Sequence, residues 1–259
     1  MTSTVNEALL EMHYHRALVR LFESTFGARF LELIKPTPGR ESWLGFDQGW
    51  AKIAIEPKAF EDELRDALAK KAAPKSLMFG YFLQFKCVKQ ILRHRARRDG
   101  TYIADPQAFD APYLRAQLDL RAKRGSGTSQ HELLMQLAGV RGADVHYACP
   151  MIFEGIDVYS EPDLDTLALI DVADAPTGWS SDEEHHILFQ TETSTPYWAS
   201  RPIRTDWVEP EDWIREAAPA DTETLLHHLA VLAEVGDVGP VFNILRLERG
   251  SRVIERPRS

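Results

Sequence analysis

The sequence predicts an α/β protein in which helices flank a central sheet, and three observations lead to this expectation. Segments with a helical spacing of apolar residues alternate along the chain with shorter apolar segments typical of strands. Residues 76–85 are bulky and aromatic, too few for a buried helix and suited to a strand covered on both faces. The 259 residues are 44% hydrophobic and 27% charged, which is ordinary for a globular protein and excludes collagen-like, coiled-coil and wholly disordered chains.

Two helices and two strands are expected before that central strand. Residues 6–26 carry leucine, methionine and phenylalanine at near-helical spacing and end at a glycine, so they predict a helix. Residues 29–34 and 43–55 predict two strands around a turn rich in proline and glycine. Residues 58–72 have one apolar and one charged side and lie between two prolines, which predicts a surface helix.

The segment after the central strand is basic. Residues 86–124, here called the basic arm, contain ten lysines and arginines against four aspartates, a net charge of +6. A short linker of small residues follows the arm. Residues 130–138 then predict a short helix, and residues 144–153 predict another strand.

The last part of the chain is acidic. Residues 157–234 contain eighteen acidic residues and three arginines, a net charge of −15, and include a tryptophan-rich irregular stretch. A strand is expected at 185–192 and a helix at 222–235. We therefore expect an α/β core over 1–156 and an acidic, tryptophan-rich C-terminal extension over 157–259 that packs on this core.

Charge and cysteine content exclude several classes of protein. The net charge of −9 argues against a protein that coats nucleic acid or an anionic membrane with its whole surface. The two cysteines, Cys87 and Cys149, lie in apolar stretches far apart, which argues against a disulfide scaffold or a zinc cluster. With neither a signal peptide nor a membrane-spanning run in the sequence, we expect a cytoplasmic protein without a membrane partner.

Polar residues at the end of the central strand carry the strongest functional signal. Gln84 and Lys86 are two positions apart, so they point to the same face of a strand that is otherwise apolar. Upstream, Glu41 and Asp47 flank a glycine bend in an aromatic segment, where a half-buried aspartate must find donors or hold a cation. These groups suit phosphodiester hydrolysis, in which oxygen ligands hold Mg²⁺ and a lysine orients the nucleophile or stabilises the charge of the transition state.

The order of these features resembles the PD-(D/E)XK nuclease superfamily, and its Mrr-type branch with a D…QxK motif most closely. A helix, a glutamate, the Gly-x-Asp segment, a hydrophobic strand ending in Gln-x-Lys, a helix and a strand follow one another over residues 6–153. The resemblance implies a mixed central sheet flanked by helices, that is, a restriction-endonuclease-like core.

The resemblance also implies roles for individual residues. Asp47 matches the metal-holding aspartate, Gln84 the Glu/Gln position and Lys86 the catalytic lysine, with Glu41 or Glu23 as the extra acid. The expected cofactor is Mg²⁺ or Mn²⁺, held by Glu41 and Asp47. Two departures exist: 36 residues separate Asp47 from Gln84, and the neutral Gln84 withholds one charge from the metal. An inactive descendant that keeps the fold therefore stays open.

Nucleic-acid contacts are expected in the basic arm and at the start of the following helix. The arginines cluster directly after the candidate lysine, where a phosphate backbone could enter; a solvated helix face is the alternative interpretation. His131, at the start of the predicted helix, is either a phosphate-contacting group or a surface residue. The candidate nucleic-acid-binding residues are Arg93, Arg95, Arg97, Arg98 and His131.

The sequence thus leads to two hypotheses about function. The first is a metal-dependent endonuclease that hydrolyses DNA, of a prokaryotic defence or restriction type. The second is a non-catalytic nuclease-fold subunit or interaction protein of a defence complex, whose acidic, tryptophan-rich part binds a basic protein partner or mimics the charge of DNA. Whether Glu41, Asp47, Gln84 and Lys86 converge discriminates between them.

Overall fold

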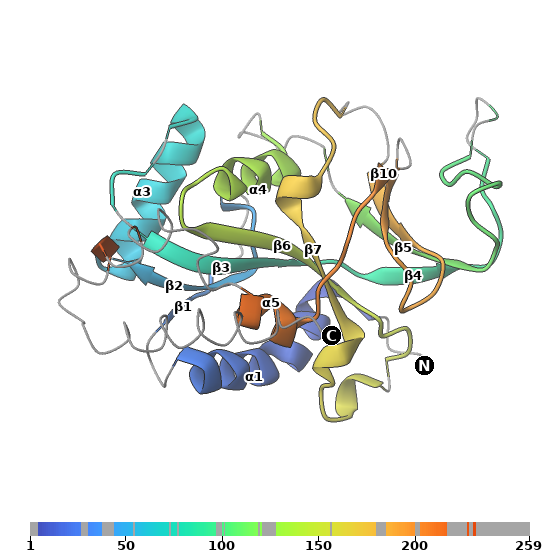
Figure 1. Ribbon diagram of the computed structural model, residues 1–259, viewed down its shortest axis with the longest axis horizontal. Coiled ribbons are helices and arrows are strands. Elements are labelled where there is room, and N and C mark those ends of the chain that lie inside the picture. Colours follow the sequence, from blue (N-terminus) through green and yellow to red (C-terminus); the bar gives the residue numbers. More distant parts are fainter. Residues whose placement is uncertain are drawn as a thin grey trace, which may run out of the picture.

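Two five-stranded sheets organise the described part of the chain, which a computed structural model defines (Figure 1). The structure describes residues 5–26, 31–37, 44–53, 55–72, 74–76, 78–96, 100, 102–118, 120, 128–155, 157–179, 185–199, 203–216, 227 and 230–231.

The first sheet is mixed and has the strand order β1-β2-β3-β6-β7. β1 pairs antiparallel with β2, and β2 pairs antiparallel with β3. β6 is parallel to β3, and β7 is antiparallel to β6. All eight residues of β3 are buried, in agreement with a central strand covered on both faces. The strands are β1 (Glu32–Ile34), β2 (Gln48–Ile53), β3 (Met78–Phe85), β6 (Ala143–Pro150) and β7 (Leu167–Asp171).

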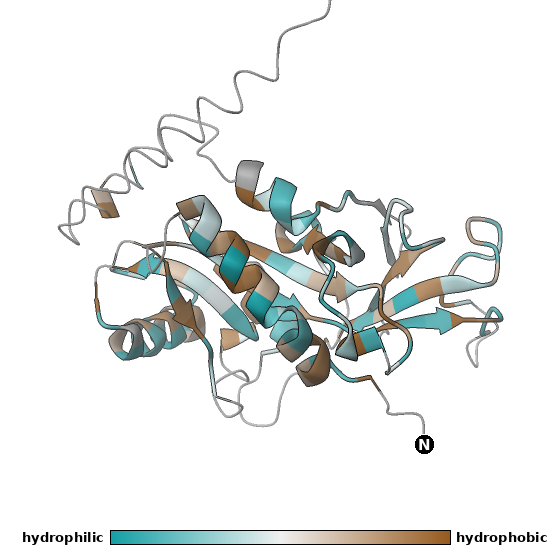
Figure 2. Cartoon of the chain, turned by 90° about the horizontal axis from the view of Figure 1, so that it is seen from below, coloured by the Kyte–Doolittle hydropathy of each residue, from teal (hydrophilic) through white to brown (hydrophobic). Residues whose placement is uncertain are grey.

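Helices cover both faces of this first sheet (Figure 1). α1 (Glu7–Phe26) lies across one face, where its buried residues pack against aromatic side chains of β2 and β3. Figure 2 shows α1 from below, with hydrophobic and hydrophilic residues alternating along it. α3 (Pro57–Lys70) and α4 (Gln130–Ala138) cover the other face, and the short α5 (Pro210–Glu216) lies beside α1.

The second sheet is antiparallel throughout and has the order β10-β9-β8-β5-β4. Only two residues separate the end of β3 from the start of β4, so the chain passes directly from the first sheet into the second. The strands are β4 (Val88–Ile91), β5 (Tyr113–Leu118), β8 (His185–Phe189), β9 (Tyr197–Ala199) and β10 (Ile203–Arg204). Three short 3-10 helices are Asp157–Tyr159, Leu164–Thr166 and Val172–Asp174.

The expected α/β fold with a mixed sheet flanked by helices is confirmed. The helices predicted over 6–26, 58–72 and 130–138 correspond to α1, α3 and α4. β4 and β5 in the basic arm were not predicted. In the acidic part β7, β9, β10 and α5 were not predicted either. The helix expected over 222–235 lies for the most part outside the described residues.

Residues beyond 156 belong to both sheets. They supply β7 at the edge of the first sheet and β8, β9 and β10 in the second. The expected boundary between a core and an acidic extension therefore runs through two hydrogen-bonded sheets. Within the described ranges, none of the helices has the length and hydropathy needed to cross a membrane.

Candidate functional site

Asp47 lies directly before β2, beside the carboxyl end of β3. Its Oδ2 accepts hydrogen bonds from the backbone N–H of Phe85 and from Nε2 of Gln84, both at 2.8 Å. Gly45, with a positive φ of 85°, allows this segment to approach α4, since a Cβ there would meet Leu133 Cβ at 3.1 Å and the carbonyl oxygen of Gln130 at 3.2 Å. The glycine bend thus brings Asp47 to both the end of β3 and the start of α4.

Gln130, the first residue of α4, joins the two polar side chains at the end of β3. Its Nε2 donates to Oε1 of Gln84 at 2.7 Å, and its Oε1 accepts from Nζ of Lys86 at 3.1 Å. Ser129 fixes the start of α4 by capping it, with its side chain accepting from the backbone N–H of Glu132. Gln84 and Lys86 are 1% and 3% exposed, so these contacts satisfy polar groups that are shielded from solvent.

The first two turns of α1 bring acidic side chains to the same place. Oε1 of Glu7 lies 3.5 Å from Nζ of Lys86, and the Glu7 side chain is 46% exposed. One turn further on, the mostly buried Glu11 forms an ion pair with Lys35. The buried lysine is therefore paired with a half-exposed carboxylate, Glu7.

The electrostatics of the site are set by the burial of Asp47. Burial raises the pKa of Asp47 from 3.8 to about 7; the hydrogen bond from Phe85 and the charge of Lys86 oppose this rise, and the charges of Glu7 and Glu11 add to it. Both hydrogen bonds to this carboxyl end on Oδ2, so Oδ1 accepts none from a described residue. A buried carboxyl group with one open oxygen among further carboxylates is an arrangement that a bound cation stabilises.

The structure brings together three of the four catalytic residues predicted from the sequence. Asp47, Gln84 and Lys86 converge, whereas Glu41 lies outside the described residues. The alternative acid, Glu23, is exposed near the C-terminal end of α1, about 24 Å along the helix from Glu7. Among described residues, Glu7 is the acid in contact with the lysine.

The predicted nucleic-acid-binding residues are spread over two environments. Arg93 and Arg95 are exposed in a non-helical segment after β4, so the interpretation as a helix face does not apply to them. Arg97 and Arg98 lie outside the described residues. His131 is 6% exposed, with Nδ1 2.8 Å from the hydroxyl oxygen of Tyr147, and burial lowers its pKa to about 4. In this arrangement it is a neutral, buried group of α4.

Sequence reasoning missed Glu7 and Gln130. Both lie in the first turn of a helix, Glu7 in α1 and Gln130 in α4, and the sequence predicts both helix starts. The start of α4 is predicted by the capping pattern Ser-Gln-His-Glu. The missing step was spatial, since nothing local in the sequence says that both helix starts lie at the end of β3.

The donor set at the site fits a hard cation. Asp47 and Glu7 offer carboxylate oxygens, which Mg²⁺ and Mn²⁺ prefer, and Asp47 Oδ1 accepts no hydrogen bond from a described residue. Gln84 turns its amide nitrogen toward Asp47 and its oxygen toward Gln130. Within the described ranges, no three histidine, cysteine, aspartate or glutamate side chains group closely enough to hold a metal ion. A cation at this place would therefore have few protein ligands and would bind weakly.

Comparisons with protein-family models, with curated proteins and with solved structures gave no match to this chain.

Proposed function

We propose that the chain is a metal-dependent nuclease that hydrolyses phosphodiester bonds of DNA, of a prokaryotic defence or restriction type. One observation carries the proposal: an aspartate, a Gln-x-Lys pair and an acid from the first helix meet at the end of one central strand. The elements α1, β1, β2, β3, α4 and β6 follow in this order, with α3 inserted before β3 and with β4 and β5 inserted before α4. This order, with β6 parallel to β3, supports a restriction-endonuclease-like core. The free thiols of Cys87 and Cys149 support a cytoplasmic location.

Three side chains would hold and use the cation. Asp47 would bind it through Oδ1, with Glu7 as a further oxygen donor, while the amide oxygen of Gln84 accepts from Gln130. Such a cation lowers the pKa of a bound water and neutralises charge on a phosphate. Lys86, buried and fixed by Gln130, places a positive charge beside these oxygens, where it can hold a phosphate oxygen or orient the attacking water.

A second candidate function rests on the hydrogen bonds that the site makes with itself. The amide nitrogen of Gln84, not its oxygen, faces Asp47, and Lys86 is paired with both Glu7 and Gln130. Apart from Oδ1 of Asp47, the polar atoms of these contacts have protein partners without a cation or a phosphate. It favours a nuclease-fold subunit that lacks activity and acts by binding a partner.

Cleavage assays distinguish the two candidates. Plasmid DNA, single-stranded DNA and RNA are incubated with the protein and Mg²⁺, Mn²⁺ or EDTA. We expect metal-dependent cleavage of DNA that falls by about 100-fold or more in Lys86→Met, because an electrostatic contact to the transition state is lost. Lys58→Met, at an exposed lysine on α3, is the matched control and should cleave like the wild type.

Circular dichroism of each variant verifies that it is folded. Equal cleavage by the wild type and Lys86→Met would show that the lysine is not catalytic and would overturn the proposed mechanism. Absence of cleavage with every substrate and both metals would overturn the nuclease and leave the non-catalytic subunit.

A further inference from the structure

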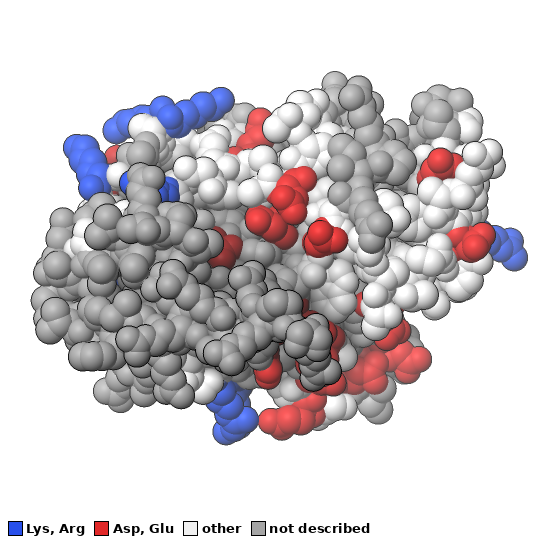
Figure 3. Space-filling view, in the orientation of Figure 1, with Lys and Arg blue, Asp and Glu red and all other residues white. Residues whose placement is uncertain are grey.

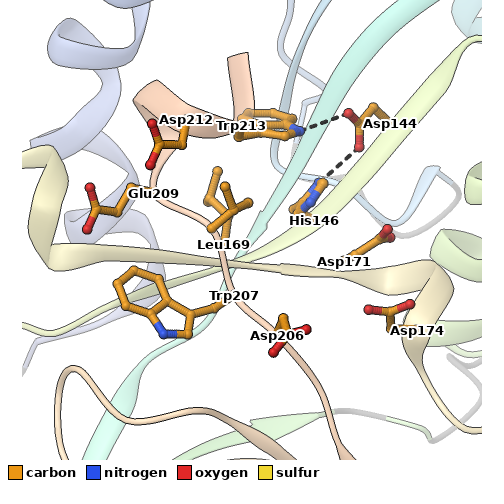
Figure 4. Close-up of a pocket in the computed structure, with 11 residues that line it drawn as sticks. Asp144, His146, Leu169, Asp171, Asp174, Asp206, Trp207, Glu209, Asp212 and Trp213 are labelled. Carbon is orange, nitrogen blue, oxygen red and sulfur yellow. Dashed lines mark hydrogen bonds and ion pairs between the residues drawn. The ribbon is translucent and has the colours of Figure 1, made fainter. Parts of the chain in front are cut away.

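An acidic cleft lies on the α1 side of the first sheet, away from the proposed nuclease site. It has a volume of about 560 Å³ and lies where the start of β6, the end of β7 and α5 meet (Figure 4). Asp144, on its wall, pairs with Tyr81 in the register of β3 and β6, five positions before Lys86. Five strand positions correspond to about 16 Å, so the cleft is a separate site.

The charge of the cleft is of one sign. Among the described residues that line it, none is a lysine or an arginine. Figure 3 shows acidic side chains clustered near the middle of the same face of the molecule. The acidic lining residues are Asp144, Asp171, Asp174, Asp206, Glu209 and Asp212.

The pKa values of two of these carboxyl groups are raised, in part by the charges of neighbouring acids. Burial raises the pKa of Asp171; the charge of His146 and the hydrogen bond from Ala173 oppose this rise, and the charges of Asp144 and Asp174 add to it. Burial and neighbouring acids likewise raise the pKa of Glu209. The cleft therefore stores unfavourable like-charge interactions that a bound positive charge relieves.

A buried histidine provides an independent indication of a ligand. His146 lines the cleft and is 5% exposed, yet its Nδ1 has no hydrogen bond to a described residue. Nδ1 lies 3.1 Å from Oδ1 of Asp144, which is an ion pair only when the ring is protonated. A neutral imidazole nitrogen in this position can accept a hydrogen bond from an ammonium group.

The shape of the cleft favours an extended cation over a metal ion. Its carboxylates are spread around the walls, as Figure 4 shows, and within the described ranges no three acids or histidines group closely enough to hold a metal. Trp207, Trp213 and Leu169 lie between the acids. Leu169 and Trp213 are buried in the core, whereas Trp207 is partly exposed, so its indole is the aromatic surface that suits a methylene chain and a cation–π contact.

We propose that this cleft binds an extended organic polycation of the polyamine class. The ammonium groups pair with separated carboxylates, with His146 accepting from one of them, and the methylene chain lies on the indole of Trp207. Asp144 is held for this role, since its Oδ2 accepts a hydrogen bond from Nε1 of Trp213 at 2.9 Å.

Titration calorimetry with spermidine tests the proposal. We expect one binding site on the wild type. The double variant Asp171→Asn with Glu209→Gln removes two charges and should lower the affinity by at least about tenfold. Asparagine still accepts the hydrogen bond from the backbone N–H of Ala173, so the variant should fold. Asp110→Asn with Glu154→Gln removes the same charge from exposed positions outside the cleft and should bind like the wild type.

Two further probes keep the result specific. Mg²⁺ at an equal concentration should compete poorly, because its charge is compact. Trilysine carries a similar charge on a peptide frame and should bind more weakly than spermidine. Tighter binding of trilysine would replace the polyamine with a basic protein segment, and equal spermidine binding by the cleft and control variants would overturn the site. Neither outcome depends on DNA cleavage.

Discussion

Replacing Asp47 with asparagine should stabilise the protein above neutral pH while it removes a group that the proposed nuclease requires. Both hydrogen bonds to this carboxyl end on one oxygen, Oδ2. The amide oxygen of asparagine can therefore keep the bonds from Phe85 and Gln84, and the substitution chiefly removes a buried charge. A side chain that serves the function of a protein often lowers the free energy of unfolding in this way.

The size of the effect follows from the raised pKa of Asp47. A rise from 3.8 to about 7 means that the folded state holds the proton more tightly than the unfolded state does. The wild type therefore loses stability as the pH rises from about 4 to about 7, and above 7 the full penalty applies. A pKa shift of this size corresponds to a loss of at most about 4 kcal/mol in the free energy of unfolding. Relaxation of the protein and entry of water reduce this loss, so we expect a value between about 2 and about 4 kcal/mol.

Urea unfolding at pH 4.5 and pH 8.5 measures this difference. Asp47→Asn should be more stable than the wild type at pH 8.5, with a clearly smaller gain at pH 4.5, and should raise the melting temperature at pH 8.5 by several degrees. Asp110→Asn, which neutralises an exposed aspartate, should show no such dependence on pH. A gain of the same size at both pH values, or a loss at pH 8.5, would refute the reasoning.

Two other predictions concern the metal and the nucleic acid. Gln84→Glu supplies the charge that the neutral amide withholds, so calorimetry should show tighter Mn²⁺ binding than in the wild type; unchanged affinity would remove residue 84 from the ligand set. Replacing the arginine cluster with alanine should flatten the slope of log affinity for duplex DNA against log salt by about 0.9 per lost phosphate contact, and an unchanged slope would exclude this surface as the DNA contact. The cluster is Arg93, Arg95, Arg97 and Arg98.

The helices and the central strand could be predicted because their signals are local. α4 begins at a capping box and ends before a glycine, and β3 is apolar except for Gln84 near its end. β4 gave no such signal, since two of its four residues are exposed and polar. α5 begins with Pro210, a recognised start signal, but its seven residues are too few to show a helical period.

The site could be predicted only in part, for a reason that concerns distance along the chain. Gln84 and Lys86 share a strand face through a spacing of two, and an aspartate in an apolar segment needs a partner wherever it lies. Glu7 and Gln130 reach the site through the packing of α1 and α4 on opposite faces of the first sheet. Such contacts between distant residues leave no periodic trace in the sequence.

The position of Lys86, between the two sheets, separates the two roles proposed for this region. Its backbone N–H donates to the carbonyl oxygen of Ala148 at 2.8 Å, which extends the parallel pairing of β3 with β6, so the first sheet fixes the lysine. The arginines follow β4, which the second sheet holds through β5. Two residues, Lys86 and Cys87, connect β3 to β4. Because the lysine is held by the first sheet and the arginines follow a strand of the second, changes in the second sheet would redirect the arginines and leave the lysine beside Asp47. Binding of DNA and chemistry at the site should therefore respond to different parts of the fold.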